Sequence, residues 1–196
     1  DVGTDAPDSP DRHPGEGAWP YGSGCERWAD RQHGVKGVGY TEGGAVIAAL
    51  FVQPDGCYSG RPDIDAWPES RDARRYAGPL PVVAHPPCQL WGAMANVNYA
   101  RWGGDHNKPG NDGGCFAAAL NSVRRFGGVL EHPAKTKAWA AHGLAQPTAI
   151  GWQRTIDGGW VCEVWQSAYG HRANKATWLY YCGTCPPFEM RWERPE

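Results

Sequence analysis

The chain has 196 residues, of which 41% are hydrophobic and 20% are charged, and a formal net charge of −2. A chain of this length can bury the core of one domain and has little room for two. Its near-neutral charge excludes the overall basic character typical of many nucleic-acid-binding domains. No apolar run approaches the roughly 20 residues of a membrane span, and the first residues lack the basic and apolar regions of a signal peptide. We therefore expect a cytoplasmic protein with no membrane partner.

Cysteine and tryptophan are the informative residue types. The seven cysteines are odd in number and scattered, so we expect reduced thiols and not a disulfide framework. Most of the eleven tryptophans are expected in the core or at its rim, although flat indole rings also suit a groove that handles nucleic-acid bases.

Residues 1–40 are rich in Gly, Pro, Asp and Ser, a composition typical of segments that do not pack into a core. We predict a flexible or loosely packed extension over residues 1–40 and a single α/β domain over residues 41–196. The first ordered element is GGAVIAALFV (Gly43–Val52), whose length suits a strand or a buried helix. A turn-rich loop follows at residues 53–62, and the charged ESRDARRY (69–76) is predicted to form a short helix.

The clearest strand is PLPVVAH (79–85), because a short β-branched run stops at two prolines. The segment GGCFAAALNSVRRF (113–126) has apolar residues at helical spacing and is followed by two glycines, which predicts a helix. Three further apolar runs are predicted strands, at residues 128–133, 160–165 and 177–182.

Strands that alternate with a helix predict an α/β fold with a Rossmann-like, largely parallel sheet. Functional loops in such sheets follow the carboxyl ends of the strands. HPPCQ (85–89) and EHP (131–133) both fall at predicted strand ends, so we expect them to lie near each other.

Cys88 stands on a loop that two prolines stiffen. Most free cysteines are small core residues, but the prolines remove backbone freedom and so set the direction of the thiol. That arrangement suits a nucleophile better than a core side chain.

His85 and His132 each precede a proline at a strand end, and we interpret both as neutral histidines that cap a loop.

Three segments together resemble the cytosine-C5 DNA methyltransferase family, especially its short phage members. They are HPPCQ, LEHP (130–133) and VWQSAYGHRANKATWLYYCG (164–183). The family has a Pro-Cys-Gln nucleophile loop, a Glu-Asn-Val strand end and a later Gln-x-Arg-x-Arg segment. The resemblance implies that Cys88 is the nucleophile, that Glu131 is the catalytic glutamate and that Lys175 is a catalytic residue in the place of the arginines.

The chemistry explains these residue types. Carbon 5 of a pyrimidine is a poor nucleophile until a thiolate adds to carbon 6, which turns the ring into an enamine that attacks an electrophile. A carboxyl group at ring nitrogen 3 supplies the proton that favours this addition. The base must first leave the duplex. The residues expected to contact it are Pro87, Gln89, Trp91 and Thr177.

The resemblance also implies S-adenosylmethionine as cofactor, DNA as partner, a methyltransferase-type fold, and a bacterial or phage-infected cell as location. The family's glycine-rich cofactor turn has no close Gly-x-Gly here, and Phe51 and Gly56 are the matching residues that remain. We predict that Phe51, Asp63 and Asp72 contact the cofactor, with Asp65 as an alternative to Asp63 at the ribose. Little sequence follows the last motif, so target recognition falls to a protein partner or to the N-terminal residues, or it is weak.

Three alternatives remain open. Cys182-x-x-Cys185 is half of a zinc site, which Cys162, Cys115, His171 or Cys25 would complete. A zinc base deaminase would need a His-x-Glu motif, which the sequence lacks. A nucleic-acid-binding protein on the same sheet and a cofactor-independent relative that acts on a modified pyrimidine are the other two.

Overall fold

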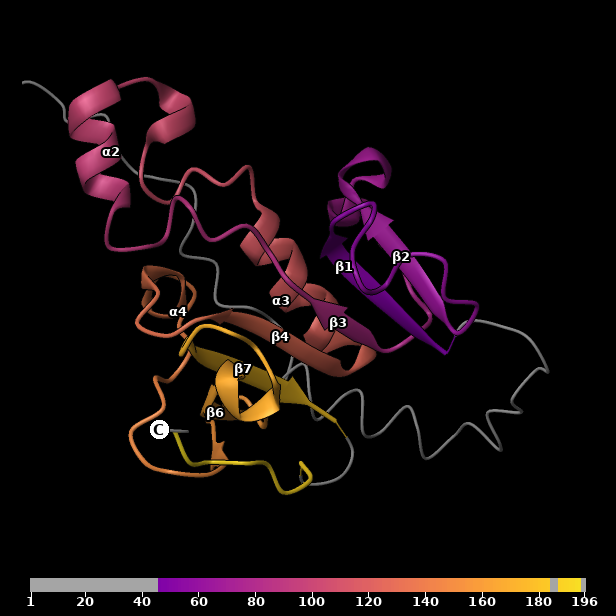
Figure 1. Ribbon diagram of the computed structural model, residues 1–196. Helices are drawn as coiled ribbons and strands as arrows, with labels where there is room; N and C mark the ends of the chain where they lie inside the picture. Colours follow the sequence, from indigo (N-terminus) through magenta and orange to yellow (C-terminus); the bar gives the residue numbers. More distant parts are fainter. Residues whose placement is uncertain (1–45, 184–186, 195–196) are drawn as a thin grey trace, which may run out of the picture.

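The computed structural model describes residues 46–183 and 187–194 (Figure 1). The extension predicted over residues 1–40 lies outside the described residues. The described residues fold as mixed α/β around a seven-stranded sheet with the order β2-β1-β3-β4-β7-β6-β5. The strands are β1 (Ile47–Val52), β2 (Ile64–Pro68), β3 (Val82–Ala84), β4 (Gly128–Pro133), β5 (Gln153–Arg154), β6 (Trp160–Trp165) and β7 (Ala176–Cys182).

The sheet has a parallel half and an antiparallel half. The pairs β1-β2, β1-β3 and β3-β4 are parallel, whereas β4-β7, β6-β7 and β5-β6 are antiparallel. Because β7 is antiparallel to β4 and β6 is antiparallel to β7, β6 runs in the same direction as β4. Strands β5 and β7 run in the opposite direction to the other strands. The expected largely parallel sheet is confirmed for the first half. It is wrong for the second, because β6 and β7 pair as antiparallel neighbours.

Helix α3 (Cys115–Phe126) lies against β3 and β4 (Figure 1). Its buried side chains, which include Phe116, Leu120 and Val123, pack into the core with residues of the central strands, as the helical spacing predicted. Asp112 caps this helix, since its carboxylate accepts the backbone N–H groups of Gly114 at 2.9 Å and Phe116 at 2.8 Å.

The remaining helical elements are short. They are α2 (Ala95–Trp102), α4 (Lys137–Ala141) and the 3₁₀ turns η1 (Glu69–Arg71), η2 (Ala73–Arg75), η3 (Asp105–Asn107) and η4 (Gln166–Tyr169). Of the helices in the described ranges, none combines the length and the apolar character that a bilayer span needs.

The helix expected over residues 69–76 is instead the pair of turns η1 and η2. Asp72 separates them because its backbone has a φ of 49°, in the left-handed region that a right-handed helix cannot include. The Asp72 side chain accepts the backbone N–H of Arg74 and so caps η2. Strand β2 and helix α2 were not expected from the sequence. Every residue of β2 is half-buried and most of α2 is exposed, so neither element needs the regular alternation of apolar and polar residues by which a sequence reveals a strand or a helix.

Gly128 brings β4 close to β3. Its φ is 114°, and a Cβ atom at this position would lie 1.9 Å from the carbonyl oxygen of Val82, the residue with which it pairs. No other residue fits there. Gly128, the second glycine after α3, is therefore needed for the close pairing of β3 with β4 as well as to end the helix.

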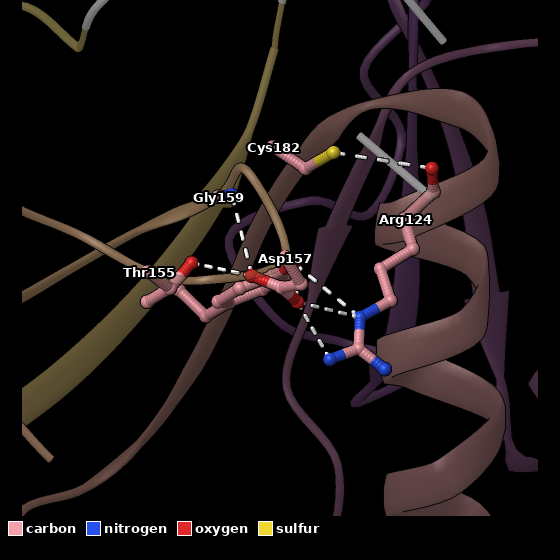
Figure 2. A network of polar contacts seen from close by, with 6 residues as sticks. Arg124, Thr155, Asp157, Gly159 and Cys182 are labelled. Atoms are coloured by element: carbon pink, nitrogen blue, oxygen red, sulfur yellow. Dashed lines mark hydrogen bonds and ion pairs between the residues drawn. The ribbon is translucent and has the colours of Figure 1, made fainter. Parts of the chain in front are cut away.

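A polar network ties α3 to the antiparallel half of the sheet (Figure 2). Asp157, in the turn between β5 and β6, accepts hydrogen bonds from Arg124 Nη2 at 2.7 Å and from the Tyr180 hydroxyl at 2.8 Å, and it also bonds Thr155. Burial raises the pKa of Asp157, but these donors outweigh it and hold the pKa below its usual value. The network keeps the β5-β6 hairpin against α3 and β7.

Cys182, at the end of β7, is disulfide-bonded, so the expectation that all thiols are reduced is wrong for this residue. Its sulfur lies 3.9 Å from the carbonyl oxygen of Arg124 (Figure 2). Because a disulfide sulfur carries no proton to donate, this approach is a packing contact and not a hydrogen bond.

Candidate active site at the carboxyl ends of the parallel strands

A cleft of about 1070 Å³ opens at the carboxyl ends of the parallel strands. β1 pairs with β2 on one side and with β3 on the other, so the chain reverses its strand order at β1. Open α/β sheets bind ligands outside the strand ends at such a switch point. The cleft is lined by the end of β1 and the loop after it (residues 51–54 and 56–58), by the end of β2 and the turns after it (67–69 and 72–74), and by the loop after β3 (85–89). Cys115, Glu131, Pro133 and Lys175 complete the lining.

The loop after β3 brings Cys88 into this cleft. The backbone N–H of Trp91 donates to the carbonyl oxygen of Cys88 at 3.0 Å, which closes a tight turn. Cys88 is a free, half-buried thiol, as a nucleophile must be if it is to meet a substrate. Cys57 and Cys115 are also free and line the cleft. Burial raises the pKa of the Cys115 thiol, which lowers its thiolate fraction at neutral pH.

Glu131 is the centre of a polar network in the same cleft. It is the fourth residue of β4, so it projects from the strand and not from the loop beyond it. Its Oε2 atom lies 3.2 Å from Nδ1 of His85. Its Oε1 atom accepts the Gln166 amide at 3.0 Å and lies 3.8 Å from Nζ of Lys175.

These neighbours determine the charge of Glu131. Burial raises the pKa of the carboxyl group, but the hydrogen bond from His85 and the positive charge of Lys175 outweigh it and hold the pKa below its usual value. Glu131 is therefore a carboxylate at neutral pH. It needs to take up a proton before it can donate one.

Lys175 and Gln166 come from the connection between β6 and β7. The backbone N–H of Gln166 donates to the carbonyl oxygen of Lys175 at 3.0 Å, which holds the two residues together. The Gln166 amide also donates to Thr177 Oγ1 at 2.9 Å. Thr177 is 1% exposed, so it orients Gln166 and does not face the cleft.

His85 and Tyr58 extend the network across the cleft. The Tyr58 hydroxyl lies 2.9 Å from Nε2 of His85, and the two rings are 5.6 Å apart between centroids. Both residues line the cleft. The interpretation of His85 as a loop cap therefore misses its contacts, which join β3, β4 and the loop after β1.

His132 points the other way. It is fully buried, its ring packs against Phe116 and Trp139, and neither ring nitrogen has a hydrogen-bond partner of good geometry. Burial lowers the pKa of His132 to about 4, although the backbone of Pro87 and the charge of Glu131 oppose the shift. It is a neutral core histidine, as expected, but it does not cap a loop.

Of the residues predicted to contact the cofactor, two line the cleft and the others do not. Phe51 and Asp72 line the cleft, and both have a positive φ, 59° and 49°, the kind of backbone strain that clusters at functional sites. Asp63 precedes β2, so it lies at the end of that strand opposite the cleft. Its carboxylate pairs with Arg61 at 2.9 Å. Asp65 lies within β2 and pairs with Arg71.

The residues predicted to contact the substrate likewise lie partly in the cleft and partly outside it. Pro87 and Gln89 line the cleft. Trp91 is 8% exposed and lies in the core, where its Nε1 donates to Asp112 at 2.9 Å. It stiffens the segment between Cys88 and α3 and does not line the cleft.

The sequence did not point to Tyr58 or Gln166, and it suggested only a loop-capping role for His85. Nothing marks Tyr58 in its loop. Gln166 stands in the last of the three resembling segments, and its place in VWQ after a strand was the available signal.

The alternative of a zinc half-site loses one ligand, because Cys182 is disulfide-bonded and thus is not a free thiolate; Cys185 and Cys25 lie outside the described residues. Cys162 is fully buried on β6, where burial raises its pKa to about 12. Within residues 46–183 and 187–194, no cluster of three or more His, Cys, Asp or Glu side chains is arranged to hold a metal ion.

Comparisons of the chain with family models, with curated proteins and with solved structures find no match.

Proposed function

We propose that the protein is a DNA-modifying enzyme that transfers a methyl group to carbon 5 of a cytosine, on a methyltransferase-type α/β domain. One observation carries the proposal: Cys88, from the loop after β3, and Glu131, from the neighbouring parallel strand β4, line one cleft at the switch point of the sheet, and Lys175 pairs with Glu131 there. A thiol, a carboxylate and a cation that converge in a cleft are the groups that addition to a pyrimidine requires.

In this proposal the Cys88 thiolate adds to ring carbon 6. The electron pair of the C5–C6 double bond moves toward nitrogen 3, where Glu131 holds a proton, and carbon 5 becomes nucleophilic. After transfer a water molecule takes the carbon-5 proton, the electron pair of that C–H bond re-forms the C5–C6 double bond, and the bond from sulfur to carbon 6 breaks to regenerate the thiolate. Lys175 and Gln166 keep the Glu131 carboxyl group oriented toward the base.

The residues of the cleft fit S-adenosylmethionine, which supplies an electrophilic methyl group when bound. The volume of about 1070 Å³ is at the upper end of ordinary ligand sites, so a cofactor and an extruded base fit together. Phe51 and Trp67 offer aromatic surface for an adenine. Glu69 follows the last residue of β2 and lines the cleft, the place where Rossmann-like sheets hold a ribose. We propose Glu69 for that contact in place of Asp63.

Helix α2 supports DNA as the partner. It projects away from the sheet (Figure 1) and begins seven residues after Cys88. Trp102 is 67% exposed and Tyr99 is 41% exposed, and the Arg101 guanidinium stacks 4.9 Å from the Trp102 ring centroid. Aromatic rings with a neighbouring arginine suit stacking and phosphate contacts with nucleic acid. A protein partner remains the proposed source of sequence specificity.

The decisive experiment is covalent trapping. We expect that duplex DNA with 5-fluorocytosine in mixed sequence, incubated with the protein and S-adenosylmethionine, forms an adduct that survives denaturation, because fluorine cannot leave as a proton does. Peptide mass spectrometry should place the bond at Cys88. Cys57→Ser and Cys115→Ser are matched controls that should keep the adduct. An adduct that persists in Cys88→Ser, or no adduct with the unchanged protein, contradicts the proposal. Calorimetry with S-adenosylmethionine alone tests the cofactor separately.

A further inference from the structure

The Glu131 carboxylate lacks the proton that the proposed reaction needs. Its contacts with His85, Gln166 and Lys175 all favour the charged form. A proton must therefore reach Glu131 from a neighbour when a base is in place. The neighbour has to release protons near neutral pH, lie within hydrogen-bond distance, and remain in contact with solvent so that it can be recharged.

His85 has the side-chain type, the distance and the exposure that these conditions call for. Its Nδ1 atom is 3.2 Å from Glu131 Oε2, and its side chain is 32% exposed. Imidazole is the side chain whose protonation ordinarily changes between about pH 5 and 8. The register of the sheet creates the contact. Ala84, the last residue of β3, pairs with Leu130 of the parallel strand β4, and His85 and Glu131 are the residues that directly follow this pair.

Tyr58 keeps the imidazole in place in both of its charge states. When the ring is neutral with a proton on Nδ1, Nε2 accepts from the Tyr58 hydroxyl. When the ring is an imidazolium, the hydroxyl oxygen accepts from Nε2. The 2.9 Å contact is therefore kept while the ring gains or loses a proton, and Nδ1 stays directed at Glu131.

We infer that His85 is a positioning residue that stores the proton for the reaction and passes it to Glu131 when a pyrimidine binds. This inference rests on the proposed function. The imidazolium gives up its Nδ1 proton, and the Glu131 carboxylate takes it up and holds it at ring nitrogen 3 as the electron pair arrives there. When sulfur leaves carbon 6, the same proton returns to Glu131 and then to His85. No proton is consumed, and no further reactant is needed.

The other groups around this pair do not replace His85. Among the described residues, the other titratable side chains in contact with the pair are Lys175, from the segment before β7, and Tyr58, from the loop after β1. Burial raises the pKa of Tyr58, and the charges of Cys57 and Glu131 add to this, so it keeps its proton at neutral pH. His132 follows Glu131 on the opposite face of β4 and is neutral.

The test measures release of tritium from carbon 5 of cytosine in mixed-sequence duplex DNA, with and without S-adenosylmethionine, between pH 5 and 9. We expect a bell-shaped rate profile for the unchanged protein, because the thiolate forms on the rising limb and the imidazolium is lost on the falling limb. His85→Gln should lower the rate about 100- to 10,000-fold and remove the falling limb. His106→Gln, an exposed histidine in η3, is the matched control and should leave the profile unchanged.

Tyr58→Phe tests the inference without removing the histidine. The lost hydroxyl was the acceptor for the imidazolium, and hydrogen bonds to charged groups are the stronger ones, so the falling limb should move to lower pH. If His85→Gln keeps the bell shape and rate of the unchanged protein, or Tyr58→Phe leaves the limb in place, the inference is wrong while the proposed function stands. If the unchanged protein releases no tritium under either condition, both are wrong.

Discussion

Nδ1 of His85 and Oε2 of Glu131 lie 3.2 Å apart, although 46 residues separate them in the chain. The contact follows from the pairing of β3 with β4, which aligns the end of one strand with the middle of the next. The same alignment brings the loop of Cys88 and the Glu131 carboxylate to one cleft. Strand register therefore assembles the candidate site.

Glu131→Gln tests the carboxyl group. The amide has nearly the same shape but cannot carry the proton to nitrogen 3, so methyl transfer should fall by about 100- to 10,000-fold. The melting temperature should change little, because Glu131 faces the cleft and not the core. DNA affinity, measured by anisotropy, should stay within a small factor. Glu189→Gln, at an exposed site, is the control. Near-normal turnover in Glu131→Gln would remove the basis for pairing Glu131 with Cys88.

Glu69→Gln and Asp63→Asn form a matched pair for the cofactor. Because Glu69 lies at the cleft end of β2 and Asp63 at the opposite end, only the first substitution should weaken S-adenosylmethionine binding. A lost hydrogen bond to a charged group corresponds to about 1.5–3 kcal/mol, or roughly a tenfold or greater rise in Kd, measured by calorimetry. The reverse order of effects would place the ribose at the other end of β2.

His132 makes stability depend on pH. In the folded protein its pKa is lowered to about 4, while in the unfolded chain it is near 6.5. The unfolded state therefore binds a proton that the folded state does not as pH falls from 6.5 toward 4, and stability decreases over that range. Between pH 6.5 and 5 the free energy of unfolding should drop by about 2 kcal/mol from this group.

His132→Phe should remove that decrease, because a phenyl ring does not titrate and can pack on Phe116 and Trp139 as the imidazole does. Urea unfolding at pH 6.5 and 5.0 measures it, above the range in which the carboxylates titrate. His171→Phe, at an exposed site, should keep the pH dependence of the unchanged protein. An equal drop in His132→Phe would assign the effect to other groups.

Trp102→Ala and Arg101→Ala test helix α2 as the DNA-contacting surface. Loss of a stacking ring weakens single-strand contacts by about 1–3 kcal/mol, so DNA affinity should fall roughly five- to 150-fold for Trp102→Ala. Folding and S-adenosylmethionine binding should not change, since α2 stands apart from the cleft. For Arg101→Ala, the slope of affinity against salt concentration should also become smaller. Unaltered DNA binding in both variants would leave α2 without a role in substrate contact.

Local patterns in the sequence determined the central elements. The apolar runs before Pro86 and at residues 128–133 form β3 and β4, and the helical spacing of Phe116, Leu120 and Val123 forms the buried face of α3. The proline-stiffened loop also indicated that Cys88 would leave the core. These features depend on neighbours in the chain, so a single sequence contains the information for them.

Only the tertiary structure decided how the site is completed. The end of the sheet at which Asp63 lies depends on where β2 begins, and the half-buried IDAWP has no periodicity that marks it. The contacts of Glu131 with His85 and Gln166 span 46 and 35 residues, and they depend on strand order and register, which no local pattern encodes. The charge of Glu131, and with it the need for a proton from His85, follows from those contacts because burial and neighbouring charges set a pKa only once the chain has folded.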